Sequence, residues 1–319
     1  MYIYIHRTSL YELQFAEKTH FYGKSMLITG ASQGIGKSIA LEVGRRGISH
    51  LILASRSKEK LEQVKEEIHI EIRETLQNIT RSGKNKLHYQ YMGLLTNIII
   101  DTVAIDLSSK TGCLELVDET QKLLRKEDKK PGLNFLVLNH ITSSHFGLWL
   151  KGDDGSINQH QDNLERMFQI NTFSYIWIAT AAINTLLRDK GHITVLSSLA
   201  GHVGVPNTAM YSSTKHALHG FFNAMRIEVR MMEVNVGIML AAIGATDTEG
   251  AKSVMEQLPT VTWDDSRGAA RAILRGIALN KREIFHPHHK VFPVVILYKC
   301  CPHIIDWLLR LINEGTIHL

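Results

Sequence analysis

The chain has 319 residues, of which 44% are hydrophobic, so it can form one large α/β domain or two smaller ones. Its formal charge of +5 is spread along the chain with acidic residues between the basic ones, and we expect no nucleic-acid partner. The three cysteines (Cys113, Cys300 and Cys301) argue against a disulfide framework and indicate a reducing compartment. Residues 1–24 contain no apolar run long enough to cross a membrane.

A strand, a glycine-rich turn and a helix are predicted between residues 25 and 47. Ser25–Thr29 is a short apolar strand, and Gly30-Ala-Ser-Gln-Gly34-Ile-Gly36 leads into a helical pattern. We expect Gly30 to permit the tight turn, Gly34 to let the backbone approach a pyrophosphate and Gly36 to let the helix pack on its strand. The helix N-terminus then offers free N–H groups to the phosphates. A glycine-rich turn without a ligand is the alternative.

The second predicted strand, His50–Ala54, is followed by Ser55-Arg56-Ser57. An NAD-preferring site has a carboxylate here for the ribose 2′-hydroxyl, and this stretch contains no acid. The guanidinium of Arg56 instead fits a 2′-phosphate through two hydrogen bonds. The pattern therefore predicts NADP(H), with an ordinary surface arginine as the alternative.

Two segments compete for the third strand after a charged helix over residues 58–74. They are Leu87–Tyr91 and Ile98–Ile105, and we favour the second because its apolar run leads into Asp106-Leu107, a polar tip suited to an adenine ring. The unit is longer than the roughly thirty residues that a strand–helix–strand crossover needs. We therefore predict an insertion within residues 70–97.

The fourth predicted strand, residues 133–138, ends at Asn139, whose amide is expected to brace the neighbouring strand. A helix over 114–124 precedes it, and a long helical pattern over 163–187 follows. That pattern contains Asn171, a residue unfavourable inside helices. Two explanations for Asn171 are open. It marks a kink that holds a water near Lys215, or it is a polar group of the core. The sixth strand is predicted over 235–240, with a loop over 241–248.

The residues from Thr194 to Phe222 bring together three reactive groups. Ser198 follows the apolar strand Ile193–Leu196, and Tyr211 and Lys215 are spaced to share one helix face. We expect the ammonium to favour the ionised phenol. A hydroxyl and a tunable phenol at one point suit a substrate oxygen that exchanges a proton as hydride moves. Such a tyrosine–lysine pair is common on helix surfaces, so the prediction also depends on the glycine-rich unit.

Apolar stretches at Val291–Leu297 and Ile304–Ile312 are too short to span a membrane. The second contains Trp307 with helical spacing, so it can lie in a membrane interface, cap a dimer or cover its own subunit. Three histidines precede the first of these stretches, namely His286, His288 and His289. They lack the spacing and the supporting shell of a metal site, so we expect no metal.

Together these elements predict an α/β fold, a single Rossmann-type doubly wound parallel sheet with helices on both faces. From about Lys24 to Leu311 the chain resembles the short-chain dehydrogenase/reductase family, and within it the 11-beta-hydroxysteroid dehydrogenase type 1-like branch. The resemblance is carried by Thr29-Gly30-x-x-x-Gly34-x-Gly36, Asn139-His140-Ile141, Asn171, Ser198, Tyr211, Lys215 and Asp247-Thr-Glu249. Gln33 departs from the branch, which has a lysine near the 2′-phosphate.

The resemblance implies a catalytic tetrad. Tyr211 is the general acid/base, and Lys215 holds the nicotinamide ribose and lowers the Tyr211 pKa. Ser198 positions the substrate oxygen, and Asn171 anchors a proton-relay water. The cofactor-binding residues implied are Gly30, Ser32, Gln33, Gly34, Ile35, Gly36, Arg56, Ser57, Asp106, Leu107, Asn139, Tyr211, Lys215 and Thr248.

The resemblance also implies an NADP(H)-dependent oxidoreductase that interconverts a lipophilic, steroid-like ketone and secondary alcohol. Sphingoid-base or retinoid carbonyls are alternative substrates. A non-catalytic nucleotide-binding protein that uses residues 70–97 as an interaction surface is the alternative of another class, and the intact tetrad argues against it.

The implied assembly is a homodimer paired through the helix of Tyr211 and Lys215. The implied location is the endoplasmic reticulum membrane, contacted through the C-terminal segment, with the cytoplasm as the alternative because the N-terminal anchor of the branch is missing. We predict an N-terminal extension over 1–23, the catalytic domain over 24–285 and the apolar C-terminal segment over 286–319.

Overall fold

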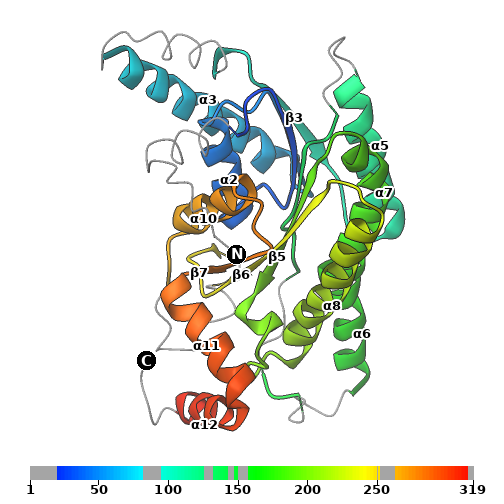
Figure 1. The fold of residues 1–319 in the computed structure, drawn as a ribbon, viewed down its shortest axis with the longest axis vertical. Coiled ribbons are helices and arrows are strands. Elements are labelled where there is room, and N and C mark those ends of the chain that lie inside the picture. Colours follow the sequence, from blue (N-terminus) through cyan, green and yellow to red (C-terminus); the bar gives the residue numbers. More distant parts are fainter. Residues whose placement is uncertain are drawn as a thin grey trace, which may run out of the picture.

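Seven parallel strands form one sheet in the order β3-β2-β1-β4-β5-β6-β7 in the computed structural model of the chain (Figure 1). The structure describes residues 20–81, 95–125, 132–142, 147–149, 157–249, 251 and 263–314. The strands are β1 (Ser25–Thr29), β2 (His50–Ser55), β3 (Ile99–Ala104), β4 (Phe135–Leu138), β5 (His192–Ser198), β6 (Gly237–Ile243) and β7 (Glu283–His286).

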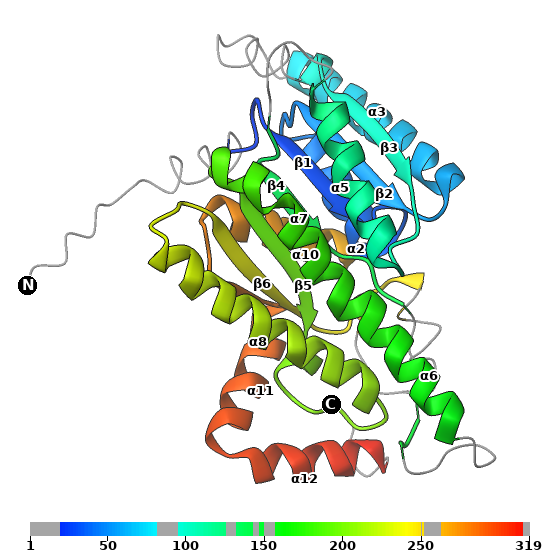
Figure 2. The ribbon, with the colours of Figure 1, turned by 90° about the vertical axis from the view of Figure 1, so that its right-hand side faces the viewer.

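Helices cover both faces of this sheet (Figure 2). One face packs against α2 (Gly34–Gly44), α3 (Lys58–Arg81) and α10 (Ser266–Ala278). The other packs against α5 (Lys110–Arg125), α7 (Ser174–Arg188) and α8 (Ala209–Met231). Because both faces are covered, every residue of β1, β2 and β4 is buried, which explains their continuous apolar runs. The predicted doubly wound fold is confirmed.

The order of the strands reverses beside β1. The chain passes from β1 outward to β2 and β3, then returns to place β4 on the other side of β1. In such sheets the crossovers leave on opposite faces at this point and open a crevice at the carboxyl ends of the strands. The fold therefore positions the glycine-rich turn after β1 at the mouth of this crevice.

The structure resolves the competition for the third strand. β3 spans Ile99–Ala104 and pairs with β2, which confirms the favoured segment, whereas Leu87–Tyr91 lies outside the described residues. α3 continues to Arg81, so the first part of the predicted 70–97 insertion extends this helix. Ile68 and Ile72 are buried one turn apart and keep that end of α3 on the core.

One strand boundary and one whole strand were predicted incorrectly in the last third of the chain. β6 runs to Ile243, so the first three residues of the predicted 241–248 loop belong to the strand. β7 was not predicted. It is a four-residue edge strand whose residues are all half-buried, so it has neither a continuous apolar run nor a clean alternation.

The long helical pattern is interrupted at the predicted asparagine. α6 (Ile157–Phe168) and α7 are joined by a π-helical turn, η2 (Gln169–Phe173), which contains Asn171.

Within the described residues, one stretch, Gln161–Arg188, has the length and apolar character of a membrane-crossing helix. Half of the most apolar 18-residue segment of this stretch is buried in the protein, and core helices of proteins that cross no membrane can have the same length and composition. The remaining helical elements are η3 (Leu199–Gly201), α11 (His288–Cys300) and α12 (Pro302–Asn313).

Acid is expected to weaken the fold through His192 at the start of β5. Burial lowers the pKa of this histidine from 6.5 to about 3. Its contribution to stability is therefore complete above about pH 6.5 and is lost as the pH falls towards 3, at about 1.4 kcal/mol per pH unit, because only the unfolded chain then binds the proton. Urea unfolding at several pH values in this range should show a shallower pH dependence for His192→Gln than for wild type. The exposed His303, changed to Gln as a control, should keep the wild-type slope, and an unchanged slope in His192→Gln would contradict the prediction.

Candidate active site

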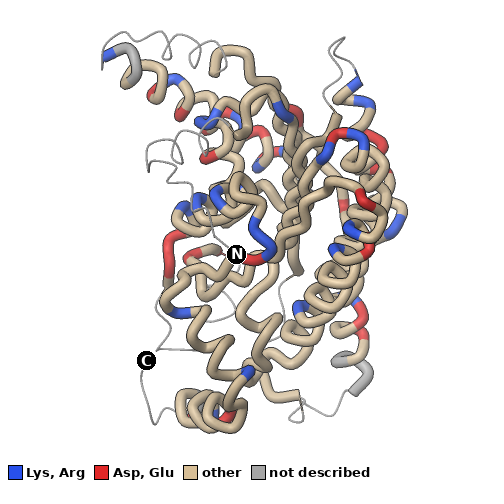
Figure 3. Tube along the Cα trace, viewed as in Figure 1, with Lys and Arg blue, Asp and Glu red and all other residues tan. Residues whose placement is uncertain are grey.

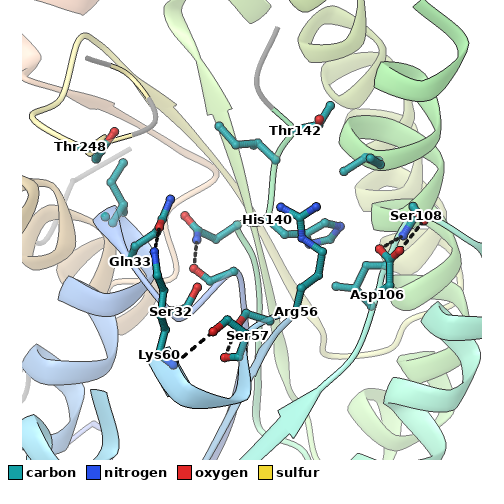
Figure 4. A pocket seen from close by; sticks show the side chains of 18 residues that line it. Ser32, Gln33, Arg56, Ser57, Lys60, Asp106, Ser108, His140, Thr142 and Thr248 are labelled. Carbon is teal, nitrogen blue, oxygen red and sulfur yellow. Dashed lines mark hydrogen bonds between the residues drawn. The ribbon is translucent and has the colours of Figure 1, made fainter. Parts of the chain in front are cut away.

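A cavity of about 310 Å³ lies at the carboxyl ends of β1, β2 and β4 (Figure 4). Most of the predicted cofactor-binding residues line it. They are Gly30, Ser32, Gln33, Gly34, Ile35, Arg56, Ser57, Asp106, Leu107, Asn139 and Thr248. Gly36, Tyr211 and Lys215 are not part of its lining. Ser55, Lys60, Ser108, His140, Ile141, Thr142 and Ile170 also line it although we did not predict them as contacts.

The turn after β1 needs glycine at two positions. Gly30 has a φ of +65°, and a Cβ there would lie 2.8 Å from the His140 Cα. A Cβ on Gly36 would lie 2.3 Å from the carbonyl oxygen of Gly30, so only glycine lets α2 begin this close to the turn. The predicted tight turn and close helix packing are confirmed, and the approach of Gly34 to a pyrophosphate stays a prediction.

Asn139 joins the ends of β1 and β4. Its side-chain amide donates to the carbonyl oxygens of Thr29 (3.2 Å) and Gly30 (3.0 Å), while its backbone N–H donates to Thr29 Oγ1 (2.9 Å). The predicted bracing of the neighbouring strand is confirmed. The next residue, His140, is buried with its ring between Thr29 Oγ1 (2.8 Å) and Ser174 Oγ (2.6 Å). Burial lowers the pKa of His140 to about 3, so this ring is neutral near pH 7.

Two cations line the cavity. Arg56 is exposed, forms no salt bridge within the described part of the chain, and extends its guanidinium into the cavity (Figure 4). Lys60, in the first turn of α3, donates from Nζ to Gln33 Oε1 at 3.3 Å. Lys60 therefore brings an ammonium beside Gln33, where the sequence lacks the lysine of the branch. The sequence pattern that could have identified Lys60 is its position in the first turn of the helix that directly follows Arg56.

The four predicted catalytic residues lie on three elements. Ser198 ends β5, and its side chain hydrogen-bonds the phenol of Tyr211. Lys215 lies one turn later on α8 with its Nζ 5.7 Å from the centre of the Tyr211 ring. Asn171 lies in η2, which the bond from Thr172 Oγ1 to the carbonyl oxygen of Thr214 (3.1 Å) ties to α8.

Lys215 is almost fully buried. Its Nζ donates to the carbonyl oxygen of Leu196 at 2.9 Å and lies 5.3 Å from the centre of the Tyr175 ring. Burial lowers the pKa of Lys215 from 10.5 to about 7, because the cation loses its hydration. A bound group that offers hydroxyls or negative charge to this ammonium will favour its protonated form.

The expected lowering of the Tyr211 pKa by Lys215 does not appear in the structure of the chain alone. Burial of the phenol raises the pKa of Tyr211 above its ordinary value, and the hydrogen bond from Ser198 only partly opposes this. The physical reason is that desolvation of the phenol outweighs the hydrogen bond.

The two polar atoms of the Asn171 side chain differ in their hydrogen bonding within the described residues. Its Oδ1 accepts from the backbone N–H of Thr142 at 2.9 Å, while its buried Nδ2 has no hydrogen-bond partner in the described residues. The π-helical turn agrees with the kink that we considered for this position. The water that it was expected to hold stays a prediction.

Three comparisons with known proteins show matches to this chain. The family described as short chain dehydrogenase matches residues 24–82 and 96–259. The chain is 32% identical over 265 residues to the hydroxysteroid 11-beta-dehydrogenase 1-like protein of Gallus gallus, covering 83% of this chain and 79% of that protein.

Among solved structures, the chain is similar to a short-chain dehydrogenase/reductase from Burkholderia phymatum in complex with NAD. The TM-score is 0.69 and the identity 15%, over 89% of this chain and 95% of that one. It is also similar to a short-chain dehydrogenase from Sphingobium yanoikuyae in complex with NADPH, with a TM-score of 0.64 and 19% identity over the same shares of the two chains. At these identities the likeness shows the fold.

Proposed function

This chain belongs to the short-chain dehydrogenase family of oxidoreductases, and from that premise we propose that it interconverts a lipophilic ketone and the corresponding secondary alcohol with NADP(H). The observation that carries the proposal is the convergence of Ser198, Tyr211 and Lys215 beside a cavity whose glycine-rich turn suits a dinucleotide. The backbone N–H groups at the start of α2 suit the pyrophosphate, since no side chain caps this helix end. Gln33 is the residue that directly precedes this helix, and its side chain does not cap it.

In this proposal the nicotinamide ring, when bound, supplies or accepts the hydride. Tyr211 gives its phenolic proton to the substrate oxygen during reduction and takes it back during oxidation. Ser198 donates a hydrogen bond to the same oxygen and holds it against the phenol. Lys215 binds the ribose hydroxyls, and a protonated Lys215 offsets the cost of ionising the buried phenol.

NADP(H) is preferred over NAD(H) in the proposal because of charge. Arg56 and Lys60 provide two cations at the end of the cavity where β2 leads into α3, and a 2′-phosphate would pair with both. Relatives of the same fold have been solved with either cofactor, so the fold does not decide between them.

The proposed substrate is steroid-like, on the strength of the chicken relative and its name. Apolar side chains beside the catalytic helix support a lipophilic substrate. Leu148 and Trp149 are exposed, and Gly147 donates its backbone N–H to Asn207 (3.0 Å) in the loop before α8, which brings this segment next to that loop. Sphingoid-base and retinoid carbonyls fit such a surface as well, and the assay below separates them.

The test is NADPH consumption by the purified chain over a panel of steroid, sphingoid-base and retinoid carbonyls, with NADH in parallel. Turnover of one class with NADPH supports the proposal and names the substrate class. Binding of NADPH without turnover of any carbonyl favours the nucleotide-binding protein instead.

We further propose that the chain forms a homodimer through α8. Ile227, Met231 and Met232 are exposed at the end of this helix, with 77% of Met231 accessible. An apolar helix end of this kind is commonly buried between subunits. Sedimentation velocity at micromolar concentration tests the proposal, and a monomer would overturn it.

We propose that α12 contacts a membrane surface, at the endoplasmic reticulum as the branch implies. α11 packs on the domain through Val291 and Val295, whereas α12 exposes Ile304 and Trp307. Few charged residues interrupt these two helices (Figure 3). The composition suits a helix lying in the interface.

Trp307→Ser is expected to weaken binding to phospholipid vesicles about tenfold, because it removes one large apolar side chain from the lipid contact. Co-sedimentation with vesicles measures this. Ile70→Ser, which removes an exposed apolar residue from α3, is the control and should bind as wild type does. Equal binding by both variants would contradict the role of α12 and favour the cytoplasmic alternative.

A further inference from the structure

Three side chains from separate parts of the chain meet beside α8, outside the cavity described above. His202 follows η3, His219 lies on α8 one turn after Lys215, and Glu283 begins β7. Glu283 Oε1 lies 2.7 Å from His202 Nε2 and 3.5 Å from His219 Nδ1. The ligand atoms of all three residues lie within 4.8 Å of one another. Two imidazoles and a carboxylate thus converge on one point.

The orientation of His219 suits a metal ligand. This residue is 7% exposed, and its Nε2 is hydrogen-bonded to Ser197 Oγ at 2.8 Å. Its Nδ1 is buried and has no hydrogen-bond partner in the described residues. When Nε2–H donates to Ser197, Nδ1 presents a lone pair towards the Glu283 carboxylate. Two electron-rich atoms then face each other, and a cation between them satisfies both.

The ionisation states of the cluster also suit a cation. Burial lowers the pKa of His219 to about 3, so its ring is neutral, as a ligand must be. Burial by itself raises the pKa of Glu283, but the hydrogen bond from His202 and the charge interactions with His202, His219 and Lys299 together bring it below its ordinary value. The cluster therefore offers the Glu283 carboxylate and the neutral ring of His219 near pH 7.

We propose that His202, His219 and Glu283 bind a divalent transition-metal cation of the zinc type. Imidazole nitrogen and carboxylate oxygen are ligands that zinc accepts, and three protein ligands leave a fourth position for water. The Glu283 side chain is 22% exposed, which gives the cation a path from solvent. Sequence spacing did not reveal this site because His202 and Glu283 are 81 residues apart.

The site adjoins the catalytic serine without overlapping it. A Cβ on Gly201 would lie 2.6 Å from Ser197 Oγ and 2.8 Å from the His219 ring, so the cluster packs directly against the turn that follows Ser198. Metal binding is nevertheless measured without any substrate, and the proposal stands or falls independently of the proposed activity.

Calorimetric titration of the chelator-treated protein with zinc chloride tests the site. The exposed adjacent thiols are first removed by C300S and C301S, because they can bind zinc themselves. We expect one zinc ion per chain and at least about 100-fold weaker binding for Glu283→Gln and for His202→Gln. H288A combined with H289A, which removes the neighbouring histidines on α11, is the control and should leave the affinity unchanged.

Two further measurements keep the test independent of folding. Ser197→Ala removes only the bond that orients His219 and should weaken zinc binding about tenfold. Near-ultraviolet circular dichroism of each variant shows whether its tertiary structure is intact. No zinc binding by the parent protein, unchanged affinity in a folded Glu283→Gln variant, or loss of binding in the α11 control would overturn the proposal.

Discussion

Tyr211→Phe is expected to lower kcat about a thousandfold, with NADPH affinity within about twofold of wild type. The change removes one oxygen, and with it the proton that the substrate oxygen must receive or lose. Ser198 cannot replace it, because a serine hydroxyl is a far weaker acid than a phenol and its Oγ also accepts a bond from the backbone N–H of Ala200 at 3.2 Å. Initial rates at saturating NADPH, with cofactor binding followed by fluorescence, measure the two quantities separately.

The matched control is Tyr22→Phe. Tyr22 bridges to Ile48 before the amino end of β1, at the opposite edge of the sheet from Tyr211, so the same change there should leave kcat unchanged. A Tyr211→Phe variant that keeps wild-type turnover would contradict the assignment of the general acid. If wild type also fails on every carbonyl while binding NADPH, the nucleotide-binding alternative gains support.

Local patterns were sufficient for the cofactor half of the site. β1, Gly30 and α2 follow one another directly, and the backbone conformation that Gly30 needs is a property of the turn itself. Asn139 was also predictable, because parallel strands β1 and β4 bring their carboxyl ends to the same edge of the sheet. Neighbouring residues determine these features, so periodicity and spacing reveal them.

Properties that depend on tertiary packing could not be predicted in this way. The pKa of Tyr211 depends on the balance between desolvation and one hydrogen bond, and the spacing to Lys215 on the helix says nothing about either. β7 forms because β6 offers it a free edge, and its own residues carry no strand pattern. The position of Lys60 in the first turn after Arg56 could be read from the sequence, but its hydrogen bond to Gln33 is a tertiary contact that the sequence does not show.

Arg56 and Lys60 are expected to determine the preference for NADPH over NADH. Replacing both by Gln is expected to raise the KM for NADPH about 100-fold, because each loses a charge-assisted bond to the 2′-phosphate. The KM for NADH should change less than about threefold, since NADH has a hydroxyl at that position. Each single variant should show roughly a tenfold effect on NADPH alone.

The control for this pair is Lys58→Gln. Lys58 is also exposed in the first turn of α3 but does not line the cavity, so its replacement changes the net charge of this region without touching the cofactor. A general electrostatic effect would lower NADPH affinity equally in Lys58→Gln and Lys60→Gln, whereas a direct contact lowers it only in the latter. If the double variant weakens NADPH and NADH equally, the two cations hold the pyrophosphate or the fold, and the preference for NADP(H) must come from elsewhere in the cavity.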